Sequence, residues 1–336
     1  MKAEKTKKLY IKRSLKMNIK KIFTGRWQVA FLAVTACFLW GSAFPSLKIS
    51  YAEVMPLNVN AYDRMIFASL RFFTASLMIF FIIFVTGQKK EVFKINKYFF
   101  PLLVLGLMQT SLQYFFFYNG LANTTGVKSS ILMTSGIFMT VVASHFVYSN
   151  DRLNFKKIVG LIFGFTGVVL VNLTKGQFDF SFVFTGEGFL IISAAVSTAA
   201  SFLAKKLTGN LNAIIVTAWQ MFMGSLILFF VSSTGSSLSR LSFDVSSLVL
   251  LFYLAFISAS AFALWYSLIK YNPLGFVTIY KFMVPVSGVV LSAFFLAEES
   301  LNIVILAAMS LVSLGIIIIN YQPILYKNSI KAETNN

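Results

Sequence analysis

Two basic residues lie inside stretches that are otherwise long enough and apolar enough to cross a membrane. Arg71 interrupts the apolar run from Met65 to Val85, and Lys281 lies early in a run that continues past Pro285. A charge inside a bilayer costs several kcal/mol, so each of these side chains needs a compensating partner. A basic side chain that faces a central cavity can bind a carboxylate or a phosphate on a substrate, and this is the chemistry that the two residues predict.

Structural roles are also open for both residues. Arg71 could pair with a protein carboxylate as a gate, or hydrogen-bond to backbone carbonyls and lock two helices together. Lys281 could extend along its helix to the membrane surface. The neighbours of Lys281 favour a functional role: Tyr280 adds a hydroxyl group, and Pro285, one turn on, removes a backbone hydrogen bond. We therefore expect a helix kink at Pro285 that exposes carbonyl oxygens to a cavity.

Polar and aromatic side chains suggest further substrate contacts. Gln109 and Gln113 are four residues apart in an apolar stretch, so they share one face of a helix that should avoid lipid. A hydrogen bond between helices would explain this pair as well as substrate binding does. Trp265 lies in a later stretch that also carries Ser258 and Tyr266. We include both glutamines, Trp265 and Tyr280 among the candidate binding residues.

Other kinds of chemistry lack the residues that they require. Cys37 is the only cysteine and His145 the only histidine, so a cysteine metal site is not expected. The sequence has no Walker-type phosphate loop and no pairing of a nucleophile with a base. We therefore expect no enzyme activity, no cofactor and no metal. Acidic residues are almost absent from the apolar stretches, which favours substrates with a carboxylate or phosphate over cationic drugs.

The composition is typical of a polytopic membrane protein. The 336 residues are 57% hydrophobic and 12% charged, whereas soluble domains carry roughly 25% charged residues. A spanning helix needs about 20 apolar residues, and the continuous runs do not alternate as those of a β-barrel would. We predict an all-α protein with ten transmembrane helices and short connections, over residues 28–50, 64–86, 98–120, 126–148, 156–173, 186–205, 212–233, 248–270, 275–297 and 302–322.

The basic residues are distributed unequally between the two sides of the membrane. Ten of the 29 Lys and Arg lie in an arm formed by residues 1–27. With a cytoplasmic N-terminus, the cytoplasmic segments and helix ends carry 22 basic residues and the outer ones carry four. This bias follows the positive-inside rule. We predict that both termini, including the tail 323–336, are cytoplasmic, and that the arm contacts anionic lipid rather than nucleic acid.

The two halves of the chain repeat one another. Several residues return 149 positions later, among them Phe73 as Phe222 and Ser76 as Ser225, while Arg71 returns as the uncharged Gln220. We predict two five-helix repeats, 28–173 and 186–322. Because five is odd, the halves must insert with opposite orientations, which is the architecture of many secondary transporters. A structural duplication without transport is the alternative.

Small residues at one point of the first half favour close helix packing. Gly160 and Gly164 are four residues apart in the stretch 156–173, a spacing that lets two helices approach closely. We expect this spacing to serve packing within the chain rather than dimerisation. The sequence leaves a monomer and a homodimer as the two possible states.

Several motifs in order resemble those of the EamA family of the drug/metabolite transporter superfamily. They are Trp40-Gly-Ser-Ala-Phe44, Ala68-Ser-Leu-Arg-Phe72, Pro285-Val286 with Ala297-Glu298, and the pairs Leu153-Asn154 and Leu301-Asn302. The resemblance covers about residues 28–322. It implies a bacterial inner-membrane secondary transporter, often an exporter of amino acids or related metabolites. It also implies a cavity lined by spans 1, 3, 4, 6, 8 and 9, which adds Trp40 to the candidate binding residues.

One departure from the family pattern bears on the cavity. The first half reads Thr134-Ser-Gly136 and Ser149-Asn-Asp151-Arg152 where the family usually has S-P and G-E-R. Without the proline, we expect the helix kink of the first half to be missing.

Three functional hypotheses remain. The first is an alternating-access transporter of small carboxylate-bearing metabolites, with Arg71 and Lys281 near the substrate path. The second is a multidrug exporter of hydrophobic cations that is indifferent to those charges. The third is a membrane scaffold or sensor without transport activity.

Overall fold

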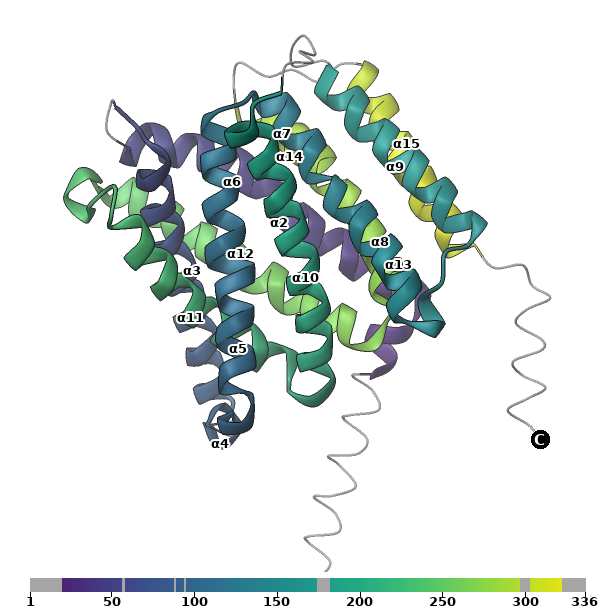
Figure 1. Cartoon of the computed structure of the whole chain (residues 1–336), viewed down its shortest axis with the longest axis horizontal. Helices are drawn as coiled ribbons and strands as arrows, with labels where there is room; N and C mark the ends of the chain where they lie inside the picture. Colours follow the sequence, from purple (N-terminus) through teal and green to yellow (C-terminus); the bar gives the residue numbers. More distant parts are fainter. Residues whose placement is uncertain are drawn as a thin grey trace, which may run out of the picture.

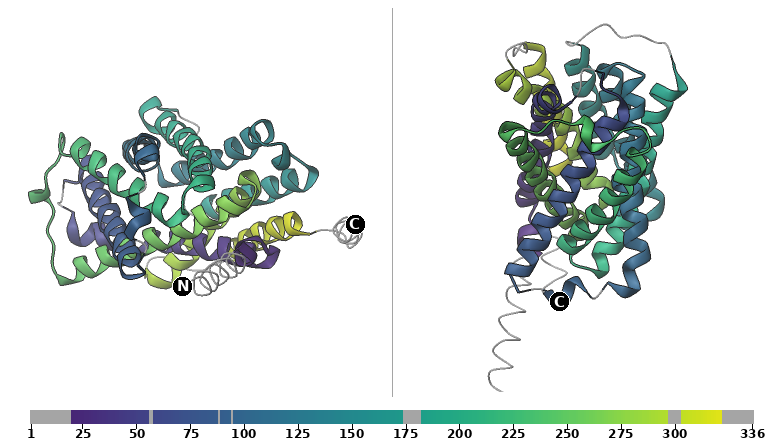
Figure 2. Two further views of the ribbon diagram at one scale, coloured as in Figure 1. Left: turned by 90° about the horizontal axis from the view of Figure 1, so that it is seen from below. Right: turned by 90° about the vertical axis from the view of Figure 1, so that its left-hand side faces the viewer.

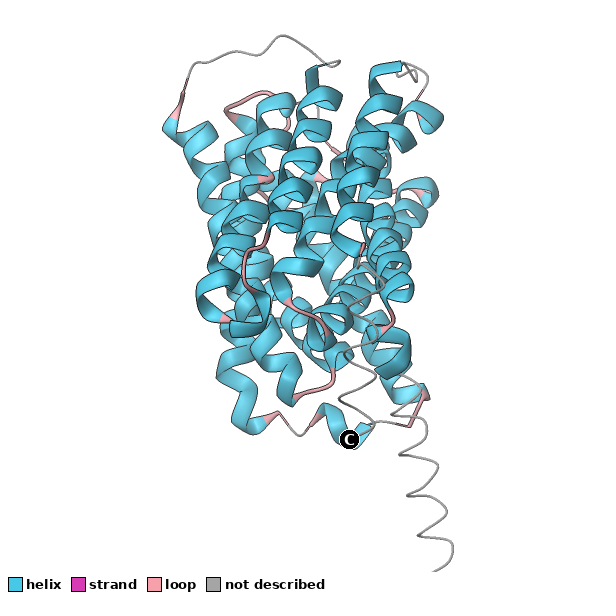
Figure 3. Ribbon diagram, turned by 90° about the vertical axis from the view of Figure 1, so that its right-hand side faces the viewer, coloured by secondary structure: helices cyan, strands magenta, loops and turns pink. Residues whose placement is uncertain are grey.

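The structure is a computed structural model that describes residues 20–55, 58–87, 89–93, 95–173, 182–296 and 303–321. Within these ranges every regular element is a helix, and no strand is present (Figure 3). Most of the basic arm and the tail 323–336 fall outside the described residues, as do Glu298 and Glu299.

The prediction of ten membrane-spanning helices is confirmed for the described part of the chain. Ten helical stretches there are long and apolar enough to cross a membrane, and their ends differ from the predicted ones by at most a few residues. We number them spans 1 to 10 in chain order: Arg26–Val54, Ala61–Val85, Asn96–Ala122, Lys128–Val147, Phe155–Leu173, Phe184–Asn210, Ala213–Ser232, Val245–Tyr271, Leu274–Phe295 and Ile303–Asn320. In lipid only a helix satisfies every backbone polar group of a single segment, which is why these apolar runs fold in this way.

Six of the ten spans are each a single α-helix. They are α2 (Arg26–Val54), α3 (Ala61–Val85), α9 (Phe155–Leu173), α11 (Ala213–Ser232), α12 (Val245–Tyr271) and α15 (Ile303–Asn320). Helix α3 begins with a capping box, in which the Asn60 side chain accepts from the Asp63 N–H at 2.8 Å and Asp63 accepts from the Asn60 N–H at 2.9 Å. This cap fixes the start of the helix that carries Arg71.

The other four spans change helix type along their length. Span 3 runs through η1 (Asn96–Tyr98), α5 (Phe99–Gly106), the π-helical turn η2 (Leu107–Leu112) and α6 (Gln113–Ala122). Span 6 joins the π-helical turn η4 (Phe184–Gly188) to α10 (Phe189–Asn210). Span 4 consists of α7 (Gly126–Met133) and α8 (Ser135–Val147), and span 9 of α13 (Leu274–Thr278), the 3₁₀ turn η6 (Ile279–Phe282) and α14 (Met283–Phe295).

The first half has a helix interruption although it lacks the proline, and the expected absence of a kink there stays a prediction. Span 4 is interrupted at Thr134, where the Thr134 N–H donates to Ile131 O at 3.1 Å and the Ile137 N–H donates to Thr134 O at 2.9 Å. The Thr134 hydroxyl also donates to Ile131 O at 2.6 Å. These i to i+3 bonds tighten the helix without a proline. In span 9 the 3₁₀ turn ends three residues before Pro285, which cannot donate to the Lys281 carbonyl.

Spans at equivalent positions of the two predicted repeats pack against each other. Helix α3 of span 2 packs against α11 of span 7, and α9 of span 5 packs against α15 of span 10. The last pair lies side by side along the right edge of the molecule (Figure 1), and two further views show how the remaining helices are grouped (Figure 2). Phe73 and its repeat partner Phe222 stack with ring centroids 5.8 Å apart.

Two glycines allow span 3 and α11 to touch through their backbones. A Cβ atom added to Gly224 would lie 2.4 Å from the Gly106 carbonyl oxygen and 2.6 Å from Thr110 Cβ. Ser111 Oγ donates to Gly224 O at 2.7 Å across the same contact. This contact sets the position of the π-helical turn that carries Gln109.

Replacing Gly224 with alanine is expected to destabilise the protein by about 1–3 kcal/mol, because backbone atoms cannot move away as a flexible side chain would. The measurement is thermal unfolding of the purified protein. Gly209 is the matched control: it lies in α10 with nothing within 4 Å of an added Cβ, so Gly209→Ala should leave the unfolding temperature unchanged or raise it. Equal unfolding temperatures for Gly224→Ala and the wild type would contradict the close contact.

Candidate functional site

A central cavity of about 880 Å³ lies among the spans. Its described lining residues come from spans 1, 3, 4, 6, 8 and 9, which agrees with the set that the family resemblance implies. Span 2 adds Arg71 and span 5 adds Asn172, while spans 7 and 10 add no described lining residue. The volume falls in the range of about 300–1,000 Å³ that is usual for small-molecule sites.

Arg71 lines the cavity without an acidic partner. Its guanidinium carbon lies 4.4 Å from the centroid of the Phe72 ring and 5.9 Å from that of Tyr114. The residue is 5% exposed and its Nε makes no hydrogen bond to a described residue. No described carboxylate forms an ion pair with it. Contacts with the aromatic rings of Phe72 and Tyr114 therefore contribute to offsetting the charge of Arg71.

Lys281 lies in a second aromatic environment. Its Nζ atom is 4.9 Å from the ring centroid of Trp265 and 5.8 Å from that of Trp40. The two indole rings are 5.3 Å apart. Among the described residues of the lining, Arg71 and Lys281 are the two cations, and the same set contains no carboxylate.

A row of aromatic rings connects the two cations. Trp40 meets Phe262 edge to face at 5.2 Å, Phe262 meets Phe72 at 6.4 Å, and Phe72 meets Tyr114 at 4.9 Å. We call Trp40, Trp265, Phe262, Phe72 and Tyr114 the aromatic row. Edge-to-face packing of this kind holds the rings in fixed positions. Four members of the row, Trp40, Trp265, Phe262 and Tyr114, line the cavity, whereas Phe72 is 1% exposed and packs outside the lining.

The π-helical turn of span 3 places Gln109 and Gln113 on the cavity. Both line it, and Gln109 Nε2 donates to Gln113 Oε1. The intervening Thr110 faces away, where its hydroxyl donates to Gln220 Oε1 at 2.9 Å. The amide oxygen of Gln109 and the amide nitrogen of Gln113 are left over from this mutual bond, so the pair can offer one acceptor and one donor to a ligand.

Tyr280 does not line the cavity, although its sequence neighbour Lys281 does. Its side chain is fully buried, and its hydroxyl accepts from Asn320 Nδ2 at 2.5 Å. Cys37 Sγ donates to the Tyr280 carbonyl at 3.3 Å. The structure therefore gives Tyr280 a packing role between spans 9 and 10, and it leaves the set of candidate binding residues.

The remaining candidates lie together, and the structure adds others that sequence reasoning missed. The cavity is lined by the other residues that the sequence predicted, which are Trp40, Arg71, Gln109, Gln113, Trp265, Lys281 and Pro285. Phe262 and Tyr114 join them as members of the aromatic row. Phe262 precedes Trp265 by three residues, so a shared helical face could have indicated it. Asn172 and the hydroxyl residues of spans 4 and 6, such as Thr140 and Thr198, carry no comparable signal in the sequence.

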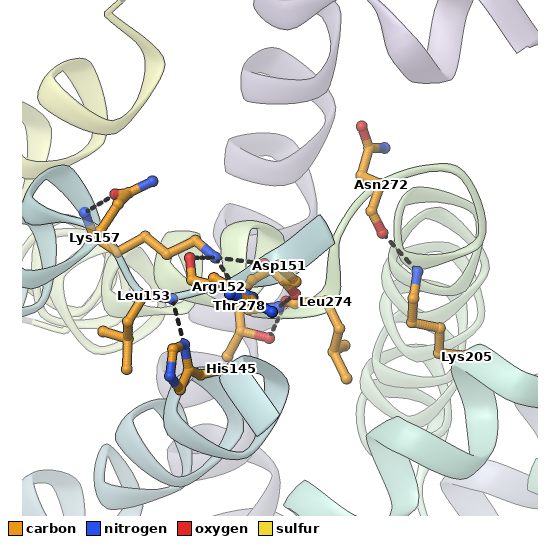
Figure 4. A network of polar contacts seen from close by, with 11 residues as sticks. His145, Asp151, Arg152, Leu153, Lys157, Lys205, Asn272, Leu274 and Thr278 are labelled. Atoms are coloured by element: carbon orange, nitrogen blue, oxygen red, sulfur yellow. Dashed lines mark hydrogen bonds and ion pairs between the residues drawn. The ribbon is translucent and has the colours of Figure 1, made fainter. Parts of the chain in front are cut away.

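A buried polar network closes one end of the bundle. Asp151, in the turn η3 (Ser149–Asp151), accepts from Lys157 Nζ at 2.5 Å and from the Gly275 N–H at 2.6 Å. Lys205 Nζ donates to the carbonyls of Ile269 and Asn272 at 2.8 and 2.7 Å. Figure 4 shows these contacts around the start of α13. The Asp151 contacts join the turn between spans 4 and 5 to span 9, and the Lys205 contacts join span 6 to the end of span 8.

A second ion pair joins the start of span 2 to the turn between spans 7 and 8. Arg240, in the turn η5 (Leu238–Arg240), donates to Asp63 Oδ1 at 2.9 Å. The hydrogen bond to Asp63 and its charge raise the pKa of Arg240. The cavity lining extends toward this end as far as Thr125, the exposed residue that caps α7. The described lining therefore reaches toward the Asp63 end, and Asp151 is not among the lining residues.

The chain is similar over most of its length to proteins whose names describe them as transporters. The family model described as "EamA-like transporter family" matches residues 27–173 and 184–321. An "Uncharacterized transporter" of Archaeoglobus fulgidus is 25% identical over 296 residues, which cover 88% of this chain and 98% of the relative. The "Uncharacterized transporter YetK" of Bacillus subtilis is 27% identical over 261 residues, 74% of this chain and 76% of the relative.

A solved structure shares the fold. One chain, described only as a crystal structure of a protein, superposes with a TM-score of 0.72 at 15% identity and covers 88% of this chain and 96% of its own length.

Proposed function

Because the chain belongs to the EamA-like transporter family and its described part has ten helices long and apolar enough to cross a membrane, we propose that it exports a small carboxylate-bearing metabolite, such as an amino acid, across a bacterial inner membrane. Arg71 and Lys281 bind the acidic group, and Trp40, Trp265, Gln109 and Gln113 contact the rest of the substrate. The export direction and the bacterial membrane rest on the family resemblance alone.

The single observation behind the anionic substrate is the pair of cavity cations without a carboxylate. Both line the cavity, and neither forms an ion pair with a described residue. Removing a cation from water costs several kcal/mol unless an opposite charge compensates. An anion that enters the cavity supplies that charge. A hydrophobic cation would instead add a third positive charge to a site of low dielectric constant, where like charges repel strongly.

Alternating access between two inverted repeats is the mechanism that we propose. The packing of span 2 on span 7 and of span 5 on span 10, together with the Phe73–Phe222 stack, supports a two-fold relation between the halves. The excess of basic residues supports a cytoplasmic Asp151 end. On that orientation the structure faces outward, and the Asp151 network is the closed cytoplasmic gate. The arm 1–27 then contacts anionic lipid on the same side.

A ligand panel tests the proposal directly. Thermal unfolding of the purified protein is measured with amino acids, organic acids, phosphorylated metabolites and lipophilic cations. A ligand present at about 100 times its Kd should stabilise by about 2.7 kcal/mol, and we expect that shift with carboxylates. A shift with lipophilic cations alone would favour the multidrug exporter. No shift, no flux and a stable protein partner after mild solubilisation would favour the scaffold.

A further inference from the structure

The two cations of the cavity occupy separate aromatic environments. Lys281 contacts the rings of Trp40 and Trp265, whereas Arg71 contacts those of Phe72 and Tyr114, and the two cations share no ring. Phe262 lies between the two environments, because it touches Trp40 on one side and Phe72 on the other. The positive charges are thus held apart by the aromatic row.

We propose, on the premise that the proposed function holds, that the cavity is a two-point site for an organic dianion with a flat apolar body. One acidic group of the ligand pairs with Arg71, the other pairs with Lys281, and the body between them lies against the ring members that line the cavity, Trp40, Trp265, Phe262 and Tyr114. Within the carboxylate-bearing metabolites of the proposed function, the substrate class is therefore an aromatic or similarly rigid diacid.

The charge of the site favours two acidic groups over one. The described lining carries two basic side chains and no acidic one. A monoanion would neutralise one cation and leave the other unpaired inside the membrane, with the cost that this entails. One acidic group could serve both cations only if they lay next to each other, and then their mutual repulsion would oppose that arrangement.

The shape of the cavity favours a rigid body over a flexible chain. The rings of the aromatic row are fixed against one another by edge-to-face and tilted contacts. A flat ligand body covers such a surface without losing internal freedom, so less of its binding energy is spent on ordering. The volume of about 880 Å³ also accommodates a ligand larger than a small amino acid.

The test compares diacids with their own monomethyl esters on the full-length wild-type protein. The probes are benzene-1,4-dicarboxylate, naphthalene-2,6-dicarboxylate and biphenyl-4,4′-dicarboxylate, which differ in the distance between their acidic groups. Calorimetry on protein in lipid nanodiscs gives each Kd. We expect at least one diacid to bind tenfold or more tightly than its monoester, and the best of the three reports the spacing of the two cations.

Three variants locate the two points. Arg71→Gln introduces the residue type that is found at the equivalent position 220 of the second repeat. Lys281→Met removes the other positive charge and keeps a side chain of similar volume. In each, we expect the diacid and its monoester to bind equally well. Lys48→Met is the matched control, because Lys48 is an exposed residue of α2 outside the cavity lining, and it should keep the wild-type preference.

The possible failures can be told apart. Equal binding of every diacid and its monoester to the wild type would overturn the two-point site, while carboxylate binding that depends on Arg71 or Lys281 would leave the proposed function intact. A wild-type protein that binds none of these acids and none of the carboxylates of the ligand panel would overturn both.

Discussion

Transport of the carboxylate that stabilises the wild type is expected to fall at least about thirtyfold in both Arg71→Gln and Lys281→Met. Removing one partner of a buried charge pair costs about 2–5 kcal/mol, and each 1.4 kcal/mol is a factor of ten in affinity. The loss is large because the described lining contains only these two cations and they contact different aromatic rings, so neither can replace the other. The measurement is counterflow of the labelled acid in proteoliposomes.

The control for this prediction is again Lys48→Met, which removes a basic residue of a span outside the cavity and should transport at the wild-type rate. Unfolding temperatures of all three variants separate lost binding from lost folding. Wild-type flux in both cavity variants would remove Arg71 and Lys281 from the substrate path and leave them as structural residues. The transporter family of the chain would be unaffected by that result.

The largest effect on stability is expected at Asp151. Its carboxylate is 1% exposed and binds Lys157 Nζ and the Gly275 N–H, which belong to different halves of the chain. Lys157 is itself 5% exposed. Replacing Asp151 with alanine leaves this ammonium group buried with only carbonyl oxygens as partners. Loss of one member of a buried pair costs about 3–5 kcal/mol, and thermal unfolding of the purified variant measures it.

A double variant distinguishes the ion pair from simple loss of packing. Asp151→Ala combined with Lys157→Met removes both charges, and buried pairs replaced by apolar side chains are often neutral in stability. We expect the double variant to recover much of the loss but not all of it, since the Gly275 N–H keeps no acceptor. If Asp151→Ala unfolds at the wild-type temperature, the network at this end of the bundle does not hold the two halves together.

Much of the architecture follows from the sequence. Apolar runs of about 20 residues with short connections leave ten helices as the solution, because lipid offers no partner for backbone polar groups. The same reasoning marks Arg71 and Lys281, since an uncompensated charge in a span is costly wherever the helix lies. The order of the motifs from Trp40 to Glu298 was sufficient to identify the family that the matched model then showed.

Which side chain faces the cavity was decided by the tertiary structure. Lys281 and Tyr280 are neighbours in the 3₁₀ turn η6, yet one meets Trp265 and the other meets Asn320. The direction of a side chain depends on the helix type around it, and a 3₁₀ or π-helical turn shifts the register of every residue that follows. Such turns arise from contacts with other spans, such as the Gly106–Gly224 approach beside Gln109.

The sequence by itself determined the class of the protein, the number of its spans and the two charges that need a partner, because these depend on local composition and on the cost of placing polar groups in lipid. The tertiary structure alone decided that spans 1, 3, 4, 6, 8 and 9 line the central cavity, that Phe262 lies between the aromatic surroundings of the two cations, and that Asp151 binds Gly275, 124 residues away. The physical reason is that these features depend on helix register and on contacts between distant segments, which no local pattern encodes.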